Sequence, residues 1–199
     1  MLTIGLTGQS GAGKGVFCRG CIRVAGVFAL DTDLVARSVV EKGSPALAEL
    51  CEYFGDGILL SDGSLDRKKL AEIAFSDTEK HEKLNSITHF YIIQKIKEWV
   101  NEMRENGAKA AIIDAPLLFE SGADALCDVT VAITAPYETR LSRIMERDGI
   151  DEKSARIRLD SQPDDDYYEE KCDYVILNVL GQEDLVLRAE RLMAHLLAQ

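Results

Sequence analysis

No stretch of this sequence approaches the ~20 consecutive apolar residues that a membrane-spanning helix requires. The apolar run at the start of the sequence is too short for a signal peptide, and no cleavage site follows it. We therefore expect a cytoplasmic protein that has no membrane partner.

Positive charge is scarce as well. The 199 residues include 23 Lys and Arg against 34 Asp and Glu, which gives a formal net charge of −11. A general nucleic-acid binder needs a basic face to neutralise phosphates, so we expect no nucleic-acid partner. Small anionic substrates remain compatible with this composition, because they need only a local cluster of cations inside a cleft.

An even number of cysteines, internal repeats and low-complexity tracts are also missing. The five cysteines are an odd number, which fits a reducing compartment better than a disulfide framework. Cys18 and Cys21 form a C-x-x-C, but no second pair and no matching histidines accompany it, so packing of a helix is the default interpretation. With 46% apolar residues the chain can bury a substantial core as one domain, into which a subdomain can be inserted.

The segment from Gly8 to Gly15 is the strongest chemical signal in the sequence. It follows an apolar run, Leu2 to Leu6, that is typical of a buried strand, and it precedes a helix-compatible run from Val16 to Val24. Its glycines and Lys14 match the pattern of a phosphate-binding loop. In such a loop the backbone N–H groups form a nest for phosphate oxygens, and the lysine reaches the β- and γ-phosphates. We therefore predict a nucleotide-phosphate site here.

Gly15 is the one departure from that pattern. The position normally carries a Ser or Thr whose hydroxyl ligates Mg²⁺. Without the hydroxyl, metal binding must depend on water or on other carboxylates, so lowered or lost activity is an open alternative. Asp114 is the candidate metal ligand, because it ends an apolar strand from Lys109, as does the acid that steadies Mg²⁺ in phosphate-loop enzymes.

Two carboxylates follow the second predicted strand, which runs from Gly26 to Leu30. Ligands gather at the carboxyl ends of strands in an open parallel sheet, so we expect Asp31 and Asp33 at the same edge as the phosphate loop. One of them suffices to cap the next helix, which leaves the second for chemistry. Arg37 lies four residues after Asp33 and can either pair with it or bind a substrate phosphate.

Residues 44–107 are predicted to be mostly helical, with a break from Gly55 to Ser64. A long amphipathic helix is indicated by apolar residues at helical spacing, namely Leu84, Ile87, Tyr91, Ile92, Ile96, Trp99, Val100 and Met103. His89 lies in this helix, where a packed or surface histidine is the simpler interpretation.

The C-terminal part is predicted to continue the sheet. Strands are expected from Asp128 to Thr134 and from Asp173 to Leu177, and a closing amphipathic helix from Gln182 to Leu197. The acidic run from Asp164 to Asp166 is predicted to be a solvated turn.

Five arginines within nineteen residues form a predicted cationic patch, namely Arg140, Arg143, Arg147, Arg156 and Arg158. Such a patch suits the clamping of a transferring phosphoryl group, and Arg143 and Arg147 are the stronger candidates. The alternative for some of the five is a solvated face on which they pair with nearby glutamates, namely Glu138, Glu146 and Glu152.

Together these motifs resemble the dephospho-coenzyme A kinase family over essentially the whole chain. The matching pieces are Ile4 to Gly8 with the phosphate loop, Asp31 to Arg37, Asp114 to Glu120, Arg143 with Arg147 and Asp148, and Arg158 with Gln162. The resemblance implies an enzyme of coenzyme A synthesis that uses ATP and Mg²⁺ to phosphorylate the ribose 3′-hydroxyl of dephospho-coenzyme A. Besides Gly15, the chain departs from the family where Phe90 follows His89 in place of a proline.

The resemblance also implies roles for single residues. Asp33 matches the catalytic carboxylate, and Lys14, Arg143 and Arg147 complete the catalytic set. Nucleotide contacts are implied for Gly8, Gly11, Ala12, Gly13, Lys14, Gly15, Val16 and Asn178. Acceptor contacts are implied for Asp31, Arg37, His89, Leu117, Glu120 and Arg158.

We predict one α/β chain of the phosphate-loop NTPase type, a five-stranded parallel sheet with helices on both faces, a helical insert and a lid. Residues 1–43 and 108–199 are assigned to the nucleotide-binding core, residues 44–107 to an acceptor-binding insert, and residues 137–163 to a lid whose closure would exclude water. Two alternatives stay open: a phosphate-loop kinase of another small hydroxyl acceptor such as a nucleoside, and a degenerate regulator that binds ATP without turnover. No oligomeric state is predicted.

Overall fold

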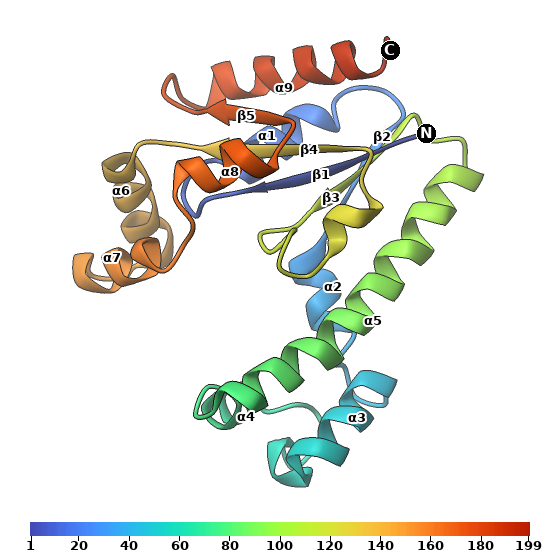
Figure 1. Cartoon of the computed structure of the whole chain (residues 1–199), viewed down its shortest axis with the longest axis vertical. Coiled ribbons are helices and arrows are strands. Elements are labelled where there is room, and N and C mark those ends of the chain that lie inside the picture. The colour runs from blue at the N-terminus through green and yellow to red at the C-terminus, as the bar shows by residue number, and fades with distance from the viewer. The chain divides into compact units, whose positions relative to one another are not determined.

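Five apolar runs of the sequence form one sheet in the computed structural model, which describes residues 1–199 (Figure 1). The strands are β1 (Leu2–Gly8), β2 (Val27–Asp31), β3 (Ala110–Asp114), β4 (Val129–Thr134) and β5 (Tyr174–Leu177). They lie in the order β2-β3-β1-β4-β5, and β1 pairs in parallel with both β3 and β4. The predicted five-stranded parallel sheet is confirmed.

The chain divides into two units, residues Met1–Leu30 with Val100–Gln199, and residues Asp31–Trp99. Helices of the first unit are α1 (Lys14–Cys21), η2 (Ala123–Leu126), α6 (Tyr137–Asp148), α7 (Glu152–Asp160), α8 (Asp165–Lys171) and α9 (Gln182–Leu196). Helices of the second unit are α2 (Thr32–Ser38), α3 (Pro45–Phe54), η1 (Asp56–Ile58), α4 (Arg67–Ala74) and α5 (Thr78–Glu105), whose last turns belong to the first unit.

The central strand β1 is buried on both of its faces. Ile4 and Leu6 join one hydrophobic cluster with residues of α1 and α9, including Phe17. Gly5 points the other way, and a Cβ there would meet Leu118 Cδ2 at 2.8 Å. This alternation is the period-2 pattern of a strand, and burial of both faces explains why parallel strands have continuous apolar sequences.

The two cysteines of the C-x-x-C belong to this core. Cys18 and Cys21 are buried within the cluster between α1 and the sheet, and none of the five cysteines is in a disulfide. Burial raises the pKa of the Cys21 thiol to about 12, so this group is protonated at neutral pH. The interpretation of these residues as packing groups of the first helix is therefore supported by their burial.

The second unit is helical, as predicted for most of its length. The long amphipathic helix is α5, in which Ile87 and Ile96 are fully buried. The predicted break from Gly55 to Ser64 contains the short helix η1, and an isolated bridge joins Leu59 within it to Leu65 just after it. No helix of either unit combines the length and the apolar character that a membrane crossing requires.

The prediction of a solvated turn from Asp164 to Asp166 is wrong, because this run begins helix α8. Asp164 caps the helix by accepting a hydrogen bond from Tyr167 N at 3.1 Å, and Asp165 and Asp166 lie in its first turn. Carboxylates are favoured at that place, where they accept from unpaired N–H groups and face the positive end of the helix dipole.

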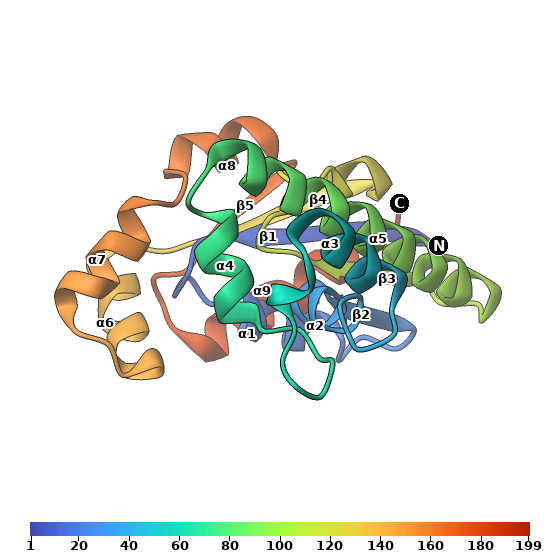
Figure 2. The same cartoon turned by 90° about the horizontal axis from the view of Figure 1, so that it is seen from below.

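Helices α6 and α7 lie side by side and form what we call the α6–α7 arm, residues 137–160 (Figure 2). The two helices contact each other through a small hydrophobic cluster, made of Leu141, Ile144, Ala155 and Leu159. The arm therefore has an internal core that does not depend on the sheet.

Candidate active site

The phosphate loop joins β1 to α1, and three of its glycines have positive φ angles. These are 138° at Gly8, 78° at Gly11 and 109° at Gly13, a region that residues with a Cβ rarely adopt. The atoms around the loop also require glycine at these positions. A Cβ at Gly13 would lie 2.7 Å from Asn178 Nδ2, and one at Gly11 would lie 2.8 Å from Arg140 O. The glycine pattern therefore follows from both the backbone and its surroundings.

The loop leads directly into the N-terminus of α1. Gly13 is the N-cap residue, and no side chain caps the helix there. The first N–H groups of a helix have no partner within it, so this end attracts anions. The nest and the helix end together form a cradle for phosphate oxygens.

Lys14 and Asp114 form an ion pair between Nζ and Oδ1 at this cradle. Their side chains are only 19% and 13% exposed. Asp114 is the last residue of β3 and lies in register with Leu6 of β1, which explains how a residue one hundred positions away reaches the lysine. The structure thus brings together the predicted phosphate-binding cation and the predicted metal ligand.

Two further predicted residues hold the loop by its backbone. Arg143 Nη1 of α6 donates to Gly11 O at 3.0 Å, and the buried Asn178 donates through Nδ2 to Ala12 O at 2.7 Å. Both bonds satisfy carbonyl groups of the loop. Arg143 and Asn178 therefore stabilise the loop conformation directly.

A second set of contacts to the loop was missed by reasoning from the sequence. Ser10 N donates to Gln162 Oε1 at 3.0 Å, and Gln162 Nε2 donates back to Ser10 Oγ at 3.0 Å. Gln9, which is 2% exposed, donates through Nε2 to Asp165 Oδ1 at 2.8 Å. Gln162 was singled out by the family resemblance alone, and no local pattern marks Gln9 or Asp165, because their partners are more than 150 residues away in the chain.

Comparison with known proteins decides the family. A family model described as dephospho-CoA kinase matches residues 2–184. The chain belongs to the dephospho-CoA kinase family. A dephospho-CoA kinase from Corynebacterium glutamicum is 42% identical over 199 residues, which are 100% of this chain and 99% of that protein.

Solved structures agree with this family. A dephospho-CoA kinase from Campylobacter jejuni has a TM-score of 0.73 and 27% identity, and the match covers 98% of this chain and 96% of that one. A shikimate kinase from Acinetobacter baumannii has a TM-score of 0.53 at 18% identity, covering 98% and 94%, and so shares the fold. The predicted kinase and the predicted phosphate-loop fold are both confirmed, and these relatives support neither of the two alternatives.

The remaining arginines of this dephospho-CoA kinase family member do not form one continuous cationic patch. Arg140 is buried and donates through Nε to Ala135 O at 2.9 Å, so it stabilises the junction of β4 and α6. Burial lowers its pKa, and its Nη1 has no hydrogen-bond partner. Arg156 pairs with Glu152 at 2.8 Å and with Glu138 at 3.7 Å, as the alternative of a solvated face predicts.

Arg147 and Arg158 share one carboxylate. Arg147 donates to both oxygens of Asp148, at 2.7 and 2.8 Å, and Arg158 Nη1 donates to Oδ2 of the same group at 2.6 Å. The hydrogen bond from Arg147 holds the pKa of Asp148 below its ordinary value. Both arginines are exposed, so their present partner can be exchanged for another anion at little cost.

Asp31, the last residue of β2, and the nearby Asp33 differ in their contacts. Asp31 caps α2 through Oδ1, which accepts from Asp33 N at 2.9 Å and from Leu34 N at 3.4 Å. The carboxylate of Asp33 lies exposed in the first turn of the helix. Arg37, in the last turn, is exposed as well and forms no ion pair with Asp33. Asp33 is therefore the carboxylate that capping does not use.

The other predicted acceptor-binding residues lie in both units. His89 is half-buried on α5 of the second unit. In the first unit Leu117 is 56% exposed, and Glu120 Oε1 accepts from Tyr167 OH at 3.2 Å. The structure contains no group of three or more His, Cys, Asp and Glu side chains that would hold a metal by themselves.

Proposed function

We propose that the chain transfers the γ-phosphate of ATP to the ribose 3′-hydroxyl of dephospho-coenzyme A, giving coenzyme A in the cytoplasm. The observation that carries the proposal is the phosphate cradle with its Lys14–Asp114 pair in a member of the dephospho-CoA kinase family. Kinase catalysis consists mainly of positioning and charge stabilisation, and the cradle is built for both.

ATP would bind with its phosphates in the nest of Gly8, Gly11, Ala12 and Gly13, whose glycines let the loop backbone pack closely against Ile133, Arg140 and Asn178. Lys14 would leave Asp114 for the β- and γ-phosphates. Asp114 suits Mg²⁺, which commonly binds through one or two carboxylates together with substrate phosphates. Bound there, the ion would supply charge neutralisation at the phosphates.

Asp33 would act as the general base. The 3′-oxygen attacks the γ-phosphorus, the bond to the oxygen that bridges the β- and γ-phosphates breaks, and ADP leaves while Asp33 accepts the hydroxyl proton. Its exposed carboxylate is available for that task, since Asp31 alone caps α2. Asp31, Arg37, His89, Leu117, Glu120 and Arg158 would bind the acceptor.

The α6–α7 arm would be the core of the lid assigned to residues 137–163. Its own hydrophobic cluster lets it move as one piece, and Arg143 connects it to the loop. Closure would bring Arg147 to the transferring phosphoryl group and exclude water, which limits ATP hydrolysis.

The test combines purified protein, ATP, Mg²⁺ and dephospho-coenzyme A, with detection of 3′-phosphorylated product. Asp33→Asn should lower kcat by about 10²- to 10⁴-fold, the usual contribution of a general base. Asp77→Asn is the matched control. Asp77 is another exposed acid at a helix start, where it accepts from Glu79 N, and Asn serves equally well there.

Absence of product from the unmodified protein at every Mg²⁺ concentration would refute the kinase proposal. An undiminished kcat in Asp33→Asn would leave the kinase proposal intact but would show that Asp33 is not the general base.

A further inference from the structure

Gly15 and Arg19 lie one turn apart on the same face of α1. A Cβ built on Gly15 would lie 3.8 Å from Arg19 Nη1, and no other atom outside the local backbone would be within 4 Å of it. Side chains on a helix lean towards its N-terminus, so the guanidinium extends back over the first turn. It therefore lies beside the place where phosphate loops usually carry a hydroxyl.

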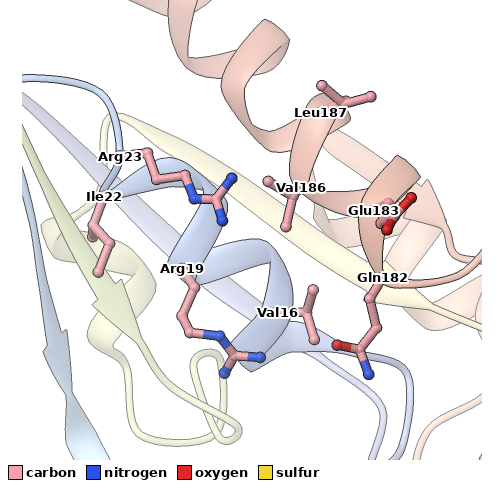
Figure 3. A pocket seen from close by; sticks show the side chains of 8 residues that line it. All are labelled: Val16, Arg19, Ile22, Arg23, Gln182, Glu183, Val186 and Leu187. Atoms are coloured by element: carbon pink, nitrogen blue, oxygen red, sulfur yellow. The ribbon is translucent and has the colours of Figure 1, made fainter.

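Arg19 also lines an open groove of about 760 Å³ between α1 and α9. Figure 3 shows the side chains of Arg19 and Gln182 pointing to the same end of this groove, where Val16 lies. Val16 follows the loop directly, so this end of the groove adjoins the phosphate cradle. Arg23 and Ile22 lie towards the other end.

The two arginines of the groove differ in their pairing. Arg23 forms an ion pair with Glu190 at 3.4 Å, whereas Arg19 has no carboxylate partner in the structure. An exposed guanidinium next to a phosphate cradle is suited to phosphate oxygens, because its planar set of N–H groups donates two parallel hydrogen bonds.

We propose that Arg19 is a nucleotide-binding residue, whose guanidinium contacts phosphate oxygens of bound ATP. Gly15 places no hydroxyl beside the Arg19 guanidinium, so no side chain at that position holds a metal there. Arg19 thus supplies charge neutralisation that in other phosphate loops comes from the metal held by the Ser or Thr hydroxyl. The inference takes ATP as the nucleotide from the proposed function, but it concerns ATP binding and not the transfer of phosphate to the acceptor.

The test measures ATP affinity by calorimetry without metal, in the presence of a chelator, for the unmodified protein, Arg19→Ala and Arg23→Ala. A hydrogen-bonded charge pair of this kind predicts about 10- to 100-fold weaker binding of ATP by Arg19→Ala. Arg23→Ala, at a position just past the end of α1 in the same groove, should bind like the unmodified protein. Arg19→Lys should recover part of the affinity, because it retains the charge without the planar donors. Unchanged affinity in Arg19→Ala, or equal losses in both alanine variants, would overturn the proposal.

A double-mutant cycle tests the link to Gly15. Gly15→Ser fits sterically, since its Cβ would make only an ordinary contact with Arg19. With Mg²⁺ present, Arg19→Ala should weaken ATP binding less in the Gly15→Ser background than in the unmodified protein; equal losses in the two backgrounds would refute the compensation. Both experiments measure ATP binding alone, so a failure of the coenzyme A assay would leave their outcome interpretable.

Discussion

The phosphate loop and the α6–α7 arm both carry the cations of a kinase, but they hold them in opposite ways. Lys14 is largely buried, and its partner Asp114 comes from a distant strand. In the arm, Arg147 and Arg158 are 56% and 50% exposed, and both pair with Asp148 of the same arm. Lys14 of the loop is held by a long-range contact, whereas these two arginines of the arm are held by local ones.

This difference indicates how the two regions would share the work of a kinase. A nest must exist before ATP arrives, because ordering it during binding would cost conformational entropy. Exposed ion pairs contribute little stability and are screened by solvent, so the arm can exchange a carboxylate for a phosphate when a substrate is present.

The largest effect is expected for a glycine-to-alanine substitution in the phosphate loop, compared with the same substitution in the α6–α7 arm. Gly13→Ala forces a Cβ against Asn178 at a φ of 109°, whereas Gly149, which ends α6 with a φ of 63°, has open space around it. We expect Gly13→Ala to lower kcat/KM by at least about 10²-fold, as when one preorganised donor is lost. Gly149→Ala should cost only about 1 kcal/mol of stability through the left-handed backbone and leave ATP affinity unchanged.

Steady-state kinetics and thermal unfolding of the two variants check this prediction. Equal losses of activity would contradict the contrast between the regions, and an active Gly13→Ala would show that the loop tolerates a different conformation.

An intermediate effect on activity is expected for Arg143, in contrast to Arg156 of the same arm. Arg143→Ala removes the hydrogen bond to Gly11 O, and we expect kcat to fall by about 10²-fold because the loop loses a support and the site loses a charge. Arg156→Ala breaks only exposed pairs with Glu152 and Glu138 and should leave the kinetics nearly unchanged. The measurement is kcat and KM for both substrates. A larger loss in Arg156→Ala than in Arg143→Ala would reverse the assignment.

The smallest effect concerns the pH dependence of stability. Hydrogen bonding to Arg147 holds the pKa of Asp148 below its ordinary 3.8, so its ionised form contributes stability at neutral pH, and that contribution is lost as the pH falls through the lowered pKa. Asp148→Asn should therefore lower Tm slightly at pH 7, and the difference from the unmodified protein should shrink below about pH 3.8. Thermal unfolding at a series of pH values measures this. A difference that grows on acidification would contradict the sign.

Local patterns explain most of what could be predicted. All five strands were found from their short apolar runs, each to within one residue at its start. The run from Asp164 to Asp166 was misjudged because acidic residues suit a solvated turn and a helix start equally well, and only the hydrogen bond to Tyr167 N distinguishes them.

The five strands, the glycine spacing of the phosphate loop and the resemblance to the family could all be read from the amino-acid sequence. These follow from periodicity and from residues close together in the chain, such as Gly8, Gly13 and Lys14. The distant groups that contact the phosphate loop became known from the three-dimensional structure. Asp114 reaches Lys14 through the register of β3 with β1, and Gln162 and Asp165 bind Ser10 and Gln9 across more than 150 residues. Such partners are chosen by packing in three dimensions, which leaves no periodic trace in the sequence.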